Sequence, residues 1–397
     1  MTIYHFLTIG IFITGLIEFF VPLRRSQKEK LFYVWFAVLL LFKGLRWDTG
    51  TDWPQYLTCF EESSWSNIFS YTRYGPGSEH MEFGYVFLNV LIKSLTGHYT
   101  FFLIFTNAFV LYAYCKLLKT LLPGCYLVAL SLVFVATELF PVRQTLTTAI
   151  FCLSYKYIQN EQFKKYLVCC LVSFTIHRSS LLFVPLYPLL RTKFNYLRSI
   201  YIYLGIIVSS IIIVRIFAAF HNLEIMNVLT GNIMDRYDAA GYYELHGHYE
   251  EETSARDIQR YLSSFVQLSI FAYPYYKFKF SSEQKHIVYG MLLNAYFVQI
   301  SLMLIGQIPG FFMVTRVANG LMIFYPLIIG MACFYFIKNN KLYIALAIFI
   351  ASFYIKASIM PPFNPEHDYY FAYQPYETII DHDSRSKTGY WPHHQQH

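Results

Sequence analysis

Long apolar runs constrain the fold of this chain more than any other feature. Runs close to the roughly 20 residues that cross a bilayer occur at 3–21, 100–118, 121–139, 199–219, 258–277, 286–306 and 317–337. Shorter apolar runs occur at 31–45, 144–160 and 342–357. Only 14% of the residues are charged, whereas about 25% is usual in soluble proteins. The pattern excludes a soluble enzyme and predicts an all-α, polytopic integral membrane protein with about ten full spans.

The basic residues of short loops predict the orientation, because cytoplasmic loops carry an excess of lysine and arginine. The loop after the first run is basic at positions 24, 25, 28 and 30, which places it in the cytoplasm. The loops 46–99 and 220–257 and the tail 358–397 then lie on the outer face. We expect a single transmembrane domain over 1–397, with no separate soluble domain.

The run 166–190 is unusual because basic residues on both flanks place its two ends on the cytoplasmic side. It is too short for two crossings of about 20 residues each. A polar group, His177-Arg178-Ser179-Ser180, stands at its middle. We therefore expect a broken-helix hairpin of two half-helices meeting at His177, a form that membranes tolerate where it lines a cavity or is buried in protein. The alternative is one ordinary span beside a misassigned loop.

Several classes of ligand find no support in the sequence. The net charge of +7 comes from basic residues scattered between apolar runs, so no nucleic-acid-binding face can be drawn. The seven cysteines show neither metal-ligand spacing nor a disulfide framework. There is no P-loop and no Gly-x-Ser-x-Gly turn. The sequence predicts no nucleic acid, no metal and no other cofactor.

Polar residues that interrupt or flank the apolar runs fall mostly on the predicted outer face. Charge in or beside a membrane is costly, so such residues are functional candidates. Arg46 and Asp52 bracket Gly50, which permits a tight turn. Glu82 opens an amphipathic segment, where its alternative role is to cap the helix.

Arg143 and Gln144 open the run 144–160 without basic neighbours. An arginine on the outer side is unusual, because basic residues are normally in excess in cytoplasmic loops. Its planar guanidinium group suits phosphate oxygens. The structural alternative for Arg143 is a buried pair with Glu138 or Asp52. Further candidates are His177, Arg178, Arg236, Arg316 and Tyr376. The structural alternatives are a core histidine for His177, a surface ion pair for Arg236 and an aromatic belt for Tyr376.

Together these residues suit a substrate that carries both phosphate and sugars, because arginine binds phosphate and aromatic faces stack on pyranose rings. The motifs, taken in order, are Arg46 with Gly50-Thr51-Asp52, Glu82-Phe83-Gly84-Tyr85, Val142-Arg143-Gln144, Ile176-His177-Arg178-Ser179 and Tyr373-Gln374-Pro375-Tyr376. Together they resemble the EpsG family of bacterial polysaccharide-synthesis membrane proteins, which is similar in role to Wzy-type O-antigen and capsule polymerases.

The resemblance implies a metal-independent glycosyltransferase with a GT-C-like fold in the bacterial plasma membrane. Its substrates would be oligosaccharide repeat units linked to undecaprenyl pyrophosphate. A growing glycan would move en bloc to the non-reducing sugar of another lipid-linked unit on the periplasmic or extracellular side. The implied partners are these lipid-linked oligosaccharides and membrane lipids, with a chain-length regulator and a flippase as further candidates.

The chemistry of this reaction assigns candidate roles to the residues. The leaving group is a pyrophosphate, so positive charge must meet developing negative charge. Arg143 is the first choice, followed by Arg316 and Arg236. Asp52 and His177 are the two candidates for the base that takes the sugar hydroxyl proton. The remaining candidates, all with binding roles, are Arg46, which could also orient Asp52, and Glu82, Gln144, Arg178 and Tyr376.

Two other functions stay open at this point. A ligase would move finished glycan from the same lipid to another acceptor with the same arginine and histidine chemistry. A transporter or flippase of lipid-linked sugars would distribute charge through the depth of the membrane, often with a repeat between halves. The sequence shows no such repeat, and its polar residues are biased outward.

Overall fold

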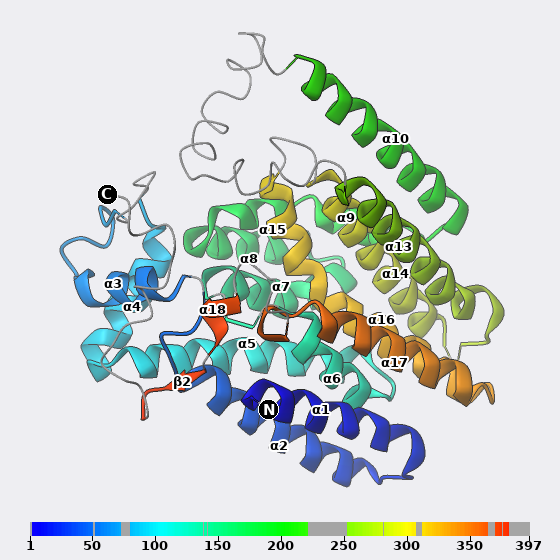
Figure 1. Cartoon of the computed structure of the whole chain (residues 1–397), viewed down its shortest axis with the longest axis horizontal. Coiled ribbons are helices and arrows are strands. Elements are labelled where there is room, and N and C mark those ends of the chain that lie inside the picture. The colour runs from blue at the N-terminus through cyan, green and yellow to red at the C-terminus, as the bar shows by residue number, and fades with distance from the viewer. Residues whose placement is uncertain are drawn as a thin grey trace. The chain divides into compact units, whose positions relative to one another are not determined.

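Helices make up nearly all of the described chain, as the sequence predicts (Figure 1). The structure is a computed structural model, and it describes residues 2–50, 52–72, 80–137, 139–140, 142–220, 252–280, 282–306, 312–363, 370–374 and 376–380. The chain divides into two units, each described here by itself. The first comprises 1–73, 80–181 and 325–397, and the second comprises 74–79 and 182–324. The assignment of 1–397 to one transmembrane domain stays a prediction.

The first unit holds the helices that position the candidate site. They are α1 (Ile3–Phe20), α2 (Arg25–Gly44), α3 (Trp53–Glu62), α4 (Phe83–Thr96), α5 (Tyr99–Leu121), α6 (Tyr126–Ala136), α7 (Arg143–Gln159), α8 (Phe163–Ile176), α16 (Phe324–Lys338), α17 (Leu342–Ser358) and α18 (Tyr370–Tyr373). The second unit is built from α9 (Leu186–Arg191), α10 (Tyr196–Phe220), α13 (Glu252–Lys277), α14 (Glu283–Ile305) and α15 (Phe312–Gly320).

Four helical stretches in the described chain are long and apolar enough to cross a membrane: Ile3–Phe20, Tyr99–Leu121, Glu283–Ile305 and Val314–Lys338. Shorter apolar helices add to them at Phe83–Thr96, Tyr126–Ala136, Tyr196–Ser209 and Leu342–Ser358. The all-α fold class is confirmed, and these helices support a multi-pass membrane protein.

Helix α6 forms the core of the first unit. Every residue from Leu127 to Ala136 is buried, and α1, α2, α5 and α17 all contact this helix. A helix that is apolar on every side is one that other helices surround. The sequence predicts a full span over 121–139, but the helix has only 11 residues. Its start is delayed by Pro123, Gly124 and Cys125, which has a left-handed backbone with φ of 56°.

A buried carboxylate from the end of the first span fixes the start of α6. Glu18 Oε2 accepts the backbone N–H groups of Leu127 at 2.7 Å and Val128 at 3.0 Å. Its other oxygen pairs with Lys28 Nζ at 2.8 Å. Negative charge at a helix N-terminus is favourable, because the first N–H groups have no partner within the helix.

The predicted helix break at His177 is present. Helix α8 ends at Ile176, and His177 has an extended backbone with φ of −155° and ψ of 123°. A 3₁₀ helix, η1 (Arg178–Phe183), follows directly. The break is confirmed, while the re-entrant path of the hairpin through the membrane stays a prediction.

The end of the described chain returns to the end of α2. Strand β1 (Arg46–Trp47) pairs antiparallel with β2 (Glu377–Thr378), with Arg46 opposite Thr378. The backbone N–H of Ile379 also donates to the Leu45 carbonyl at 3.0 Å. This contact joins the first and last parts of the first unit beside the candidate site.

Candidate active site

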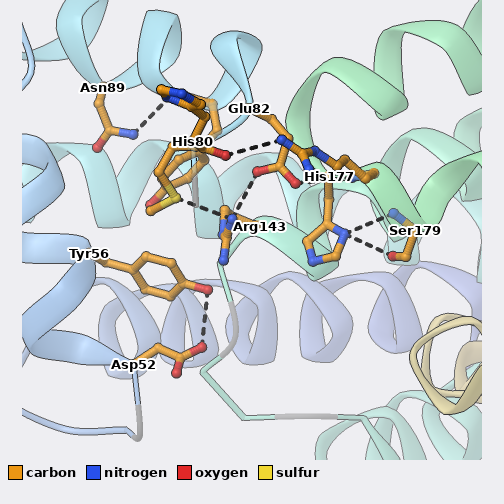
Figure 2. A network of polar contacts seen from close by, with 11 residues as sticks. Asp52, Tyr56, His80, Glu82, Asn89, Arg143, His177 and Ser179 are labelled. Carbon is orange, nitrogen blue, oxygen red and sulfur yellow. Dashed lines mark hydrogen bonds and ion pairs between the residues drawn. The ribbon is translucent and has the colours of Figure 1, made fainter. Parts of the chain in front are cut away.

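An ion pair between Arg143 and Glu82 stands at the centre of the polar residues in the first unit (Figure 2). Arg143 Nη1 lies 2.8 Å from Glu82 Oε2 and 3.2 Å from the sulfur of Met81. The two charged side chains are only 12% and 11% exposed. Arg143 begins α7 and Glu82 immediately precedes α4, so the pair joins the starts of two helices.

Two tyrosines bracket the Arg143 guanidinium. Its Cζ lies 5.7 Å from the ring centroid of Tyr56 and 5.8 Å from that of Tyr85. An arginine within about 6 Å of an aromatic ring is attracted to the negative ring face. Arg143 Nε is buried and has no hydrogen-bond partner in the described part of the chain. The group is therefore held in place while keeping one donor for another acceptor.

Asp52 lies on the far side of Tyr56. The Tyr56 hydroxyl donates to Asp52 Oδ2 at 3.2 Å, one helical turn along α3. Asp52 precedes α3, yet its side chain makes no capping hydrogen bond to that helix. The carboxylate is half-buried, so it can accept a proton from a group that approaches the cluster.

His177 sits at the helix break, 6% exposed, with its ring orientation set by Ser179. The Ser179 backbone N–H donates to His177 Nδ1 at 3.2 Å, and the Ser179 hydroxyl lies 2.8 Å from the same nitrogen. A neutral imidazole whose Nδ1 accepts carries its proton on Nε2. This pattern assigns His177 the Nε2–H tautomer, which makes it a hydrogen-bond donor.

Glu82 also binds the segment that carries His177. Glu82 Oε1 accepts the backbone N–H of Arg178 at 3.1 Å, at the start of η1. The alternative role for Glu82, a cap of α4, is not seen, because its side chain makes no capping hydrogen bond to that helix. Burial favours the neutral acid, but Arg143 and backbone hydrogen bonds outweigh it and hold the pKa of the Glu82 carboxyl below its usual value.

A glycine allows the close packing that makes this contact possible. Helices α4 and α8 pack together, and a Cβ on Gly84 would lie 2.3 Å from Thr175 Oγ1. Any side chain at this position would force the helices apart. Gly84 is thus the residue that lets Glu82, two positions earlier, reach the start of η1.

Arg46 is almost fully buried and holds the turn before α3. Its Nη1 donates to the Thr49 carbonyl at 3.3 Å, and its Cζ lies 4.5 Å from the Phe140 ring centroid. Gly50 in this turn has φ of 106°, a conformation that favours glycine. Burial lowers the pKa of the Arg46 guanidinium. These contacts are those of a residue that shapes the turn, and its roles toward phosphate or Asp52 stay predictions.

Tyr376 packs the end of the described chain against α2. Its ring stacks on Phe42 with centroids 4.9 Å apart, and its hydroxyl donates to the Phe42 carbonyl. Tyr4 adds an edge-on contact at 5.8 Å. Helix packing accounts for this residue, and a role in sugar binding stays a prediction.

The remaining candidates occupy different places. Gln144 is half-buried beside Arg143 in the first turn of α7. The exposed side chain of Arg178 donates to the His80 carbonyl at 3.4 Å. Arg316 belongs to α15 in the second unit, and its role toward the pyrophosphate stays a prediction. Arg236 lies outside the described residues.

The structure brings four residues from outside the candidate set into contact with a candidate residue. They are Tyr56 and Met81, together with Tyr85 and Ser179, which belong to the motifs quoted above. Tyr56 could have been found from its spacing, because it follows Asp52 by four positions at the start of a helix. Within the described ranges, no group of three histidine, cysteine or acidic residues is placed to hold a metal ion.

The cluster brings together a cation, a carboxylate that can take a proton and a histidine N–H donor. Figure 2 shows Arg143 and Glu82 between Tyr56 and Asp52 on one side and His177 and Ser179 on the other. Such a set can stabilise a departing phosphate while a hydroxyl group is deprotonated.

Comparison with known proteins gives one match. The model of a family described as the EpsG family matches residues 29–378, which includes every residue of the cluster. No curated protein and no solved structure matches the chain.

Proposed function

The chain belongs to the EpsG family, which is linked to exopolysaccharide biosynthesis, and from this we propose that it polymerises oligosaccharide repeat units carried on undecaprenyl pyrophosphate. The donor is a growing glycan on the lipid, and the acceptor is the non-reducing sugar of another lipid-linked unit. The bond between the anomeric carbon and the pyrophosphate oxygen breaks as a new glycosidic bond forms. The acceptor hydroxyl loses its proton, and undecaprenyl pyrophosphate leaves.

The partly buried Arg143–Glu82 pair is the observation that carries this proposal. A pyrophosphate gains negative charge as the glycosidic bond breaks, and Arg143 can meet that charge from a site with little water. Its Nε has no partner in the described part of the chain, which leaves a donor for a phosphate oxygen. Electrostatic stabilisation is strongest where the donor is already fixed, because no reorganisation is needed during the reaction.

Glu82 acts as a positioning residue in this scheme. It holds Arg143 through one carboxylate oxygen and the start of η1 through the other. One side chain therefore sets the distance between the cation and the helix break that carries His177. Replacing Glu82 with a neutral residue would break the ion pair and leave Arg143 with an unpaired, poorly hydrated charge.

Asp52 is the favoured base for the acceptor hydroxyl. Its side chain is half-buried, makes no capping hydrogen bond to α3, and is oriented by the hydroxyl of Tyr56. His177 is the less suitable base, because Ser179 donates to its Nδ1 and the proton then resides on Nε2. We assign His177 the role of a donor to a substrate oxygen, on phosphate or sugar.

The setting of the reaction follows from the predicted orientation. We propose a multi-pass plasma-membrane protein with about ten spans and a GT-C-like arrangement. The cluster would face the periplasmic or extracellular side. In this scheme, protein side chains provide all of the acid–base and electrostatic catalysis. The lipid-linked repeat units are its substrates, and a chain-length regulator and a flippase are its proposed partners.

The lipid-linked intermediates of a deletion strain test this proposal. Loss of a polymerase should leave single repeat units on undecaprenyl pyrophosphate, and complementation with the native gene should restore the polymer. Complementation with Arg143→Ala should fail, whereas Arg198→Ala, which removes an exposed arginine of α10, should succeed. Accumulation of long lipid-linked chains would instead identify a ligase, because polymerisation would then precede the blocked step.

A further inference from the structure

A basic pocket lies at the other end of the first unit from the Arg143 cluster. It has a volume of about 400 Å³, within the usual range for small-molecule sites, about 300 to 1,000 Å³. It forms where the α1–α2 turn meets the α5–α6 turn, and none of its lining residues belongs to the cluster. The cations that line it are Arg25, Lys28 and Lys119, against a single carboxylate, Glu29.

The two sites are separated by about one membrane thickness. The start of α5 packs against the helices that carry the cluster, with the rings of Tyr99 and Trp53 5.1 Å apart. The end of α5 carries Lys119 and reaches the basic pocket. A helix of 23 residues rises about 34 Å, and the hydrocarbon core of a bilayer is about 30 Å thick. Figure 1 shows that the end of α5 lies beside the α1–α2 turn. If α5 spans the bilayer as the sequence predicts, a pocket at this end lies at the level of lipid headgroups.

The charges of the pocket are only partly neutralised by the protein. Lys28 pairs with the buried Glu18 at 2.8 Å, and Arg25 pairs with Glu29 at 3.2 Å although its side chain is 89% exposed. Lys119 has no carboxylate partner among the described residues. Its Nζ instead lies over the rings of Phe32 at 4.8 Å and Tyr33 at 4.1 Å.

A residue with an unsatisfied polar group also lines the pocket. The hydroxyl of Tyr126 is buried and has no hydrogen-bond partner in the described part of the chain. A buried polar atom without a partner is costly, so a small rotation that brings it to an external acceptor is favoured. The pocket is thus lined by the Lys119 ammonium group and by a tyrosine with an unused donor, beside two further cations.

The exposed apolar surface of α2 next to the pocket suits acyl chains. Helix α2 starts at the pocket, and along it Tyr33, Val34 and Leu41 are all more than half exposed. Apolar side chains that stay exposed on a membrane helix face lipid. A ligand with a phosphate in the pocket can therefore lay its hydrocarbon chains along α2.

We infer that this pocket binds a phosphate group, with the headgroup of an anionic phospholipid as its source. Basic pockets between membrane helices at the headgroup level are suited to acidic lipids. The same donors would also bind a free phosphate anion, so the test must separate the two sources. The inference does not depend on the polymerase reaction, because it concerns residues at the opposite end of the unit.

Native mass spectrometry of the full-length protein can measure this binding after removal of bound lipid. Phosphatidylglycerol should bind more tightly than phosphatidylcholine, and Lys119→Gln should weaken it about tenfold, the effect of one charge-assisted hydrogen bond. Tyr126→Phe should weaken it about threefold to tenfold without lowering the unfolding midpoint, because its hydroxyl binds no described protein atom. Lys116→Gln is the matched control, since it removes a lysine of the same helix that does not line the pocket.

Inorganic phosphate is the second probe. If it displaces phosphatidylglycerol at millimolar concentration, the pocket takes a free phosphate, and if it does not, the lipid headgroup is the ligand. Equal binding of the two phospholipids, with no competition by phosphate, would overturn the inference. An equal loss in Lys119→Gln and Lys116→Gln would overturn it as well, because general charge would then explain the binding.

Discussion

Arg143 and Glu82 lie 61 positions apart in the sequence but only 2.8 Å apart in the structure. Their pairing joins the starts of α7 and α4, and the second oxygen of Glu82 extends the link to the start of η1. The cluster therefore depends on one carboxylate for the relative positions of three segments. That dependence makes Glu82 the residue whose loss should disturb both stability and activity.

Glu82→Gln should lower the free energy of unfolding by about 1 to 3 kcal/mol, because Arg143 loses its charged partner in a poorly hydrated site. Unfolding of the purified protein in detergent, followed by intrinsic fluorescence, measures this change. Glu61→Gln is the control, since it removes an exposed carboxylate of α3. Equal midpoints for the native protein and Glu82→Gln would show that the ion pair contributes nothing to stability.

Arg143→Lys should keep the positive charge but lose the planar fork that reaches Glu82 and a substrate oxygen together. We expect polymerising activity to fall about tenfold or more. Arg143→Ala should fall about 100- to 1,000-fold, as for the loss of a fixed electrostatic donor. Initial rates of chain elongation compare the variants, and native activity in Arg143→Lys would mean that the fork geometry is irrelevant.

Asp52→Asn should abolish proton acceptance and lower activity about 100- to 10,000-fold, while leaving the fold intact. Tyr56→Phe removes one hydrogen bond to Asp52 and should cost about threefold to tenfold. The maximal elongation rates of the two variants give the two losses. Their ratio shows whether Asp52 acts as a base or as a packing residue. A milder effect for Asp52→Asn than for Tyr56→Phe would reject Asp52 as the base.

His177→Gln should retain more activity than His177→Ala, because the glutamine amide can replace a histidine N–H donor but cannot act as a base. The expected rate of His177→Gln lies within about tenfold of the native rate, the value of one hydrogen bond. Elongation assays of both variants decide the matter. Equally complete loss in the two would assign His177 to proton transfer instead of donation.

Acid should weaken the protein through Glu82. Its pKa is lower in the folded state than the usual value of 4.5, so the stabilising contribution is complete above that value. It is lost as the pH falls through the lower pKa of the folded state, because the protonated acid no longer pairs with Arg143. The difference in unfolding midpoint between the native protein and Glu82→Gln should therefore shrink below about pH 4.5. A constant difference down to pH 3 would contradict this linkage.

Much of the helical order was predictable from apolar runs. The run 3–21 corresponds to α1, and the polar group after Ile176 correctly indicates the break at His177. The run 121–139 was misleading, because its composition is that of a span while Pro123 and Gly124 delay the helix. Its apolar residues serve the interior of the unit instead of facing lipid. Composition alone does not separate these two surroundings, since both favour the same side chains.

The partners of the candidate residues were not predictable from the sequence. Arg143 stands out because it is an isolated charge beside an apolar run. Its structural alternative was a buried pair with Asp52 or with Glu138, which lies outside the described residues, whereas the described partner is Glu82. That choice depends on how α4 packs on α8, which Gly84 permits through its close approach to Thr175. Such a long-range contact leaves no pattern within either local segment.

In the proposed reaction, Arg143 drives the departure of undecaprenyl pyrophosphate as the glycan is transferred. The most direct test is chain elongation by the purified protein in lipid, supplied with repeat units linked to undecaprenyl pyrophosphate in the presence of EDTA. We expect a ladder of longer lipid-linked products from the native protein and from Arg198→Ala, and almost none from Arg143→Ala. A normal ladder from Arg143→Ala would contradict this role of Arg143.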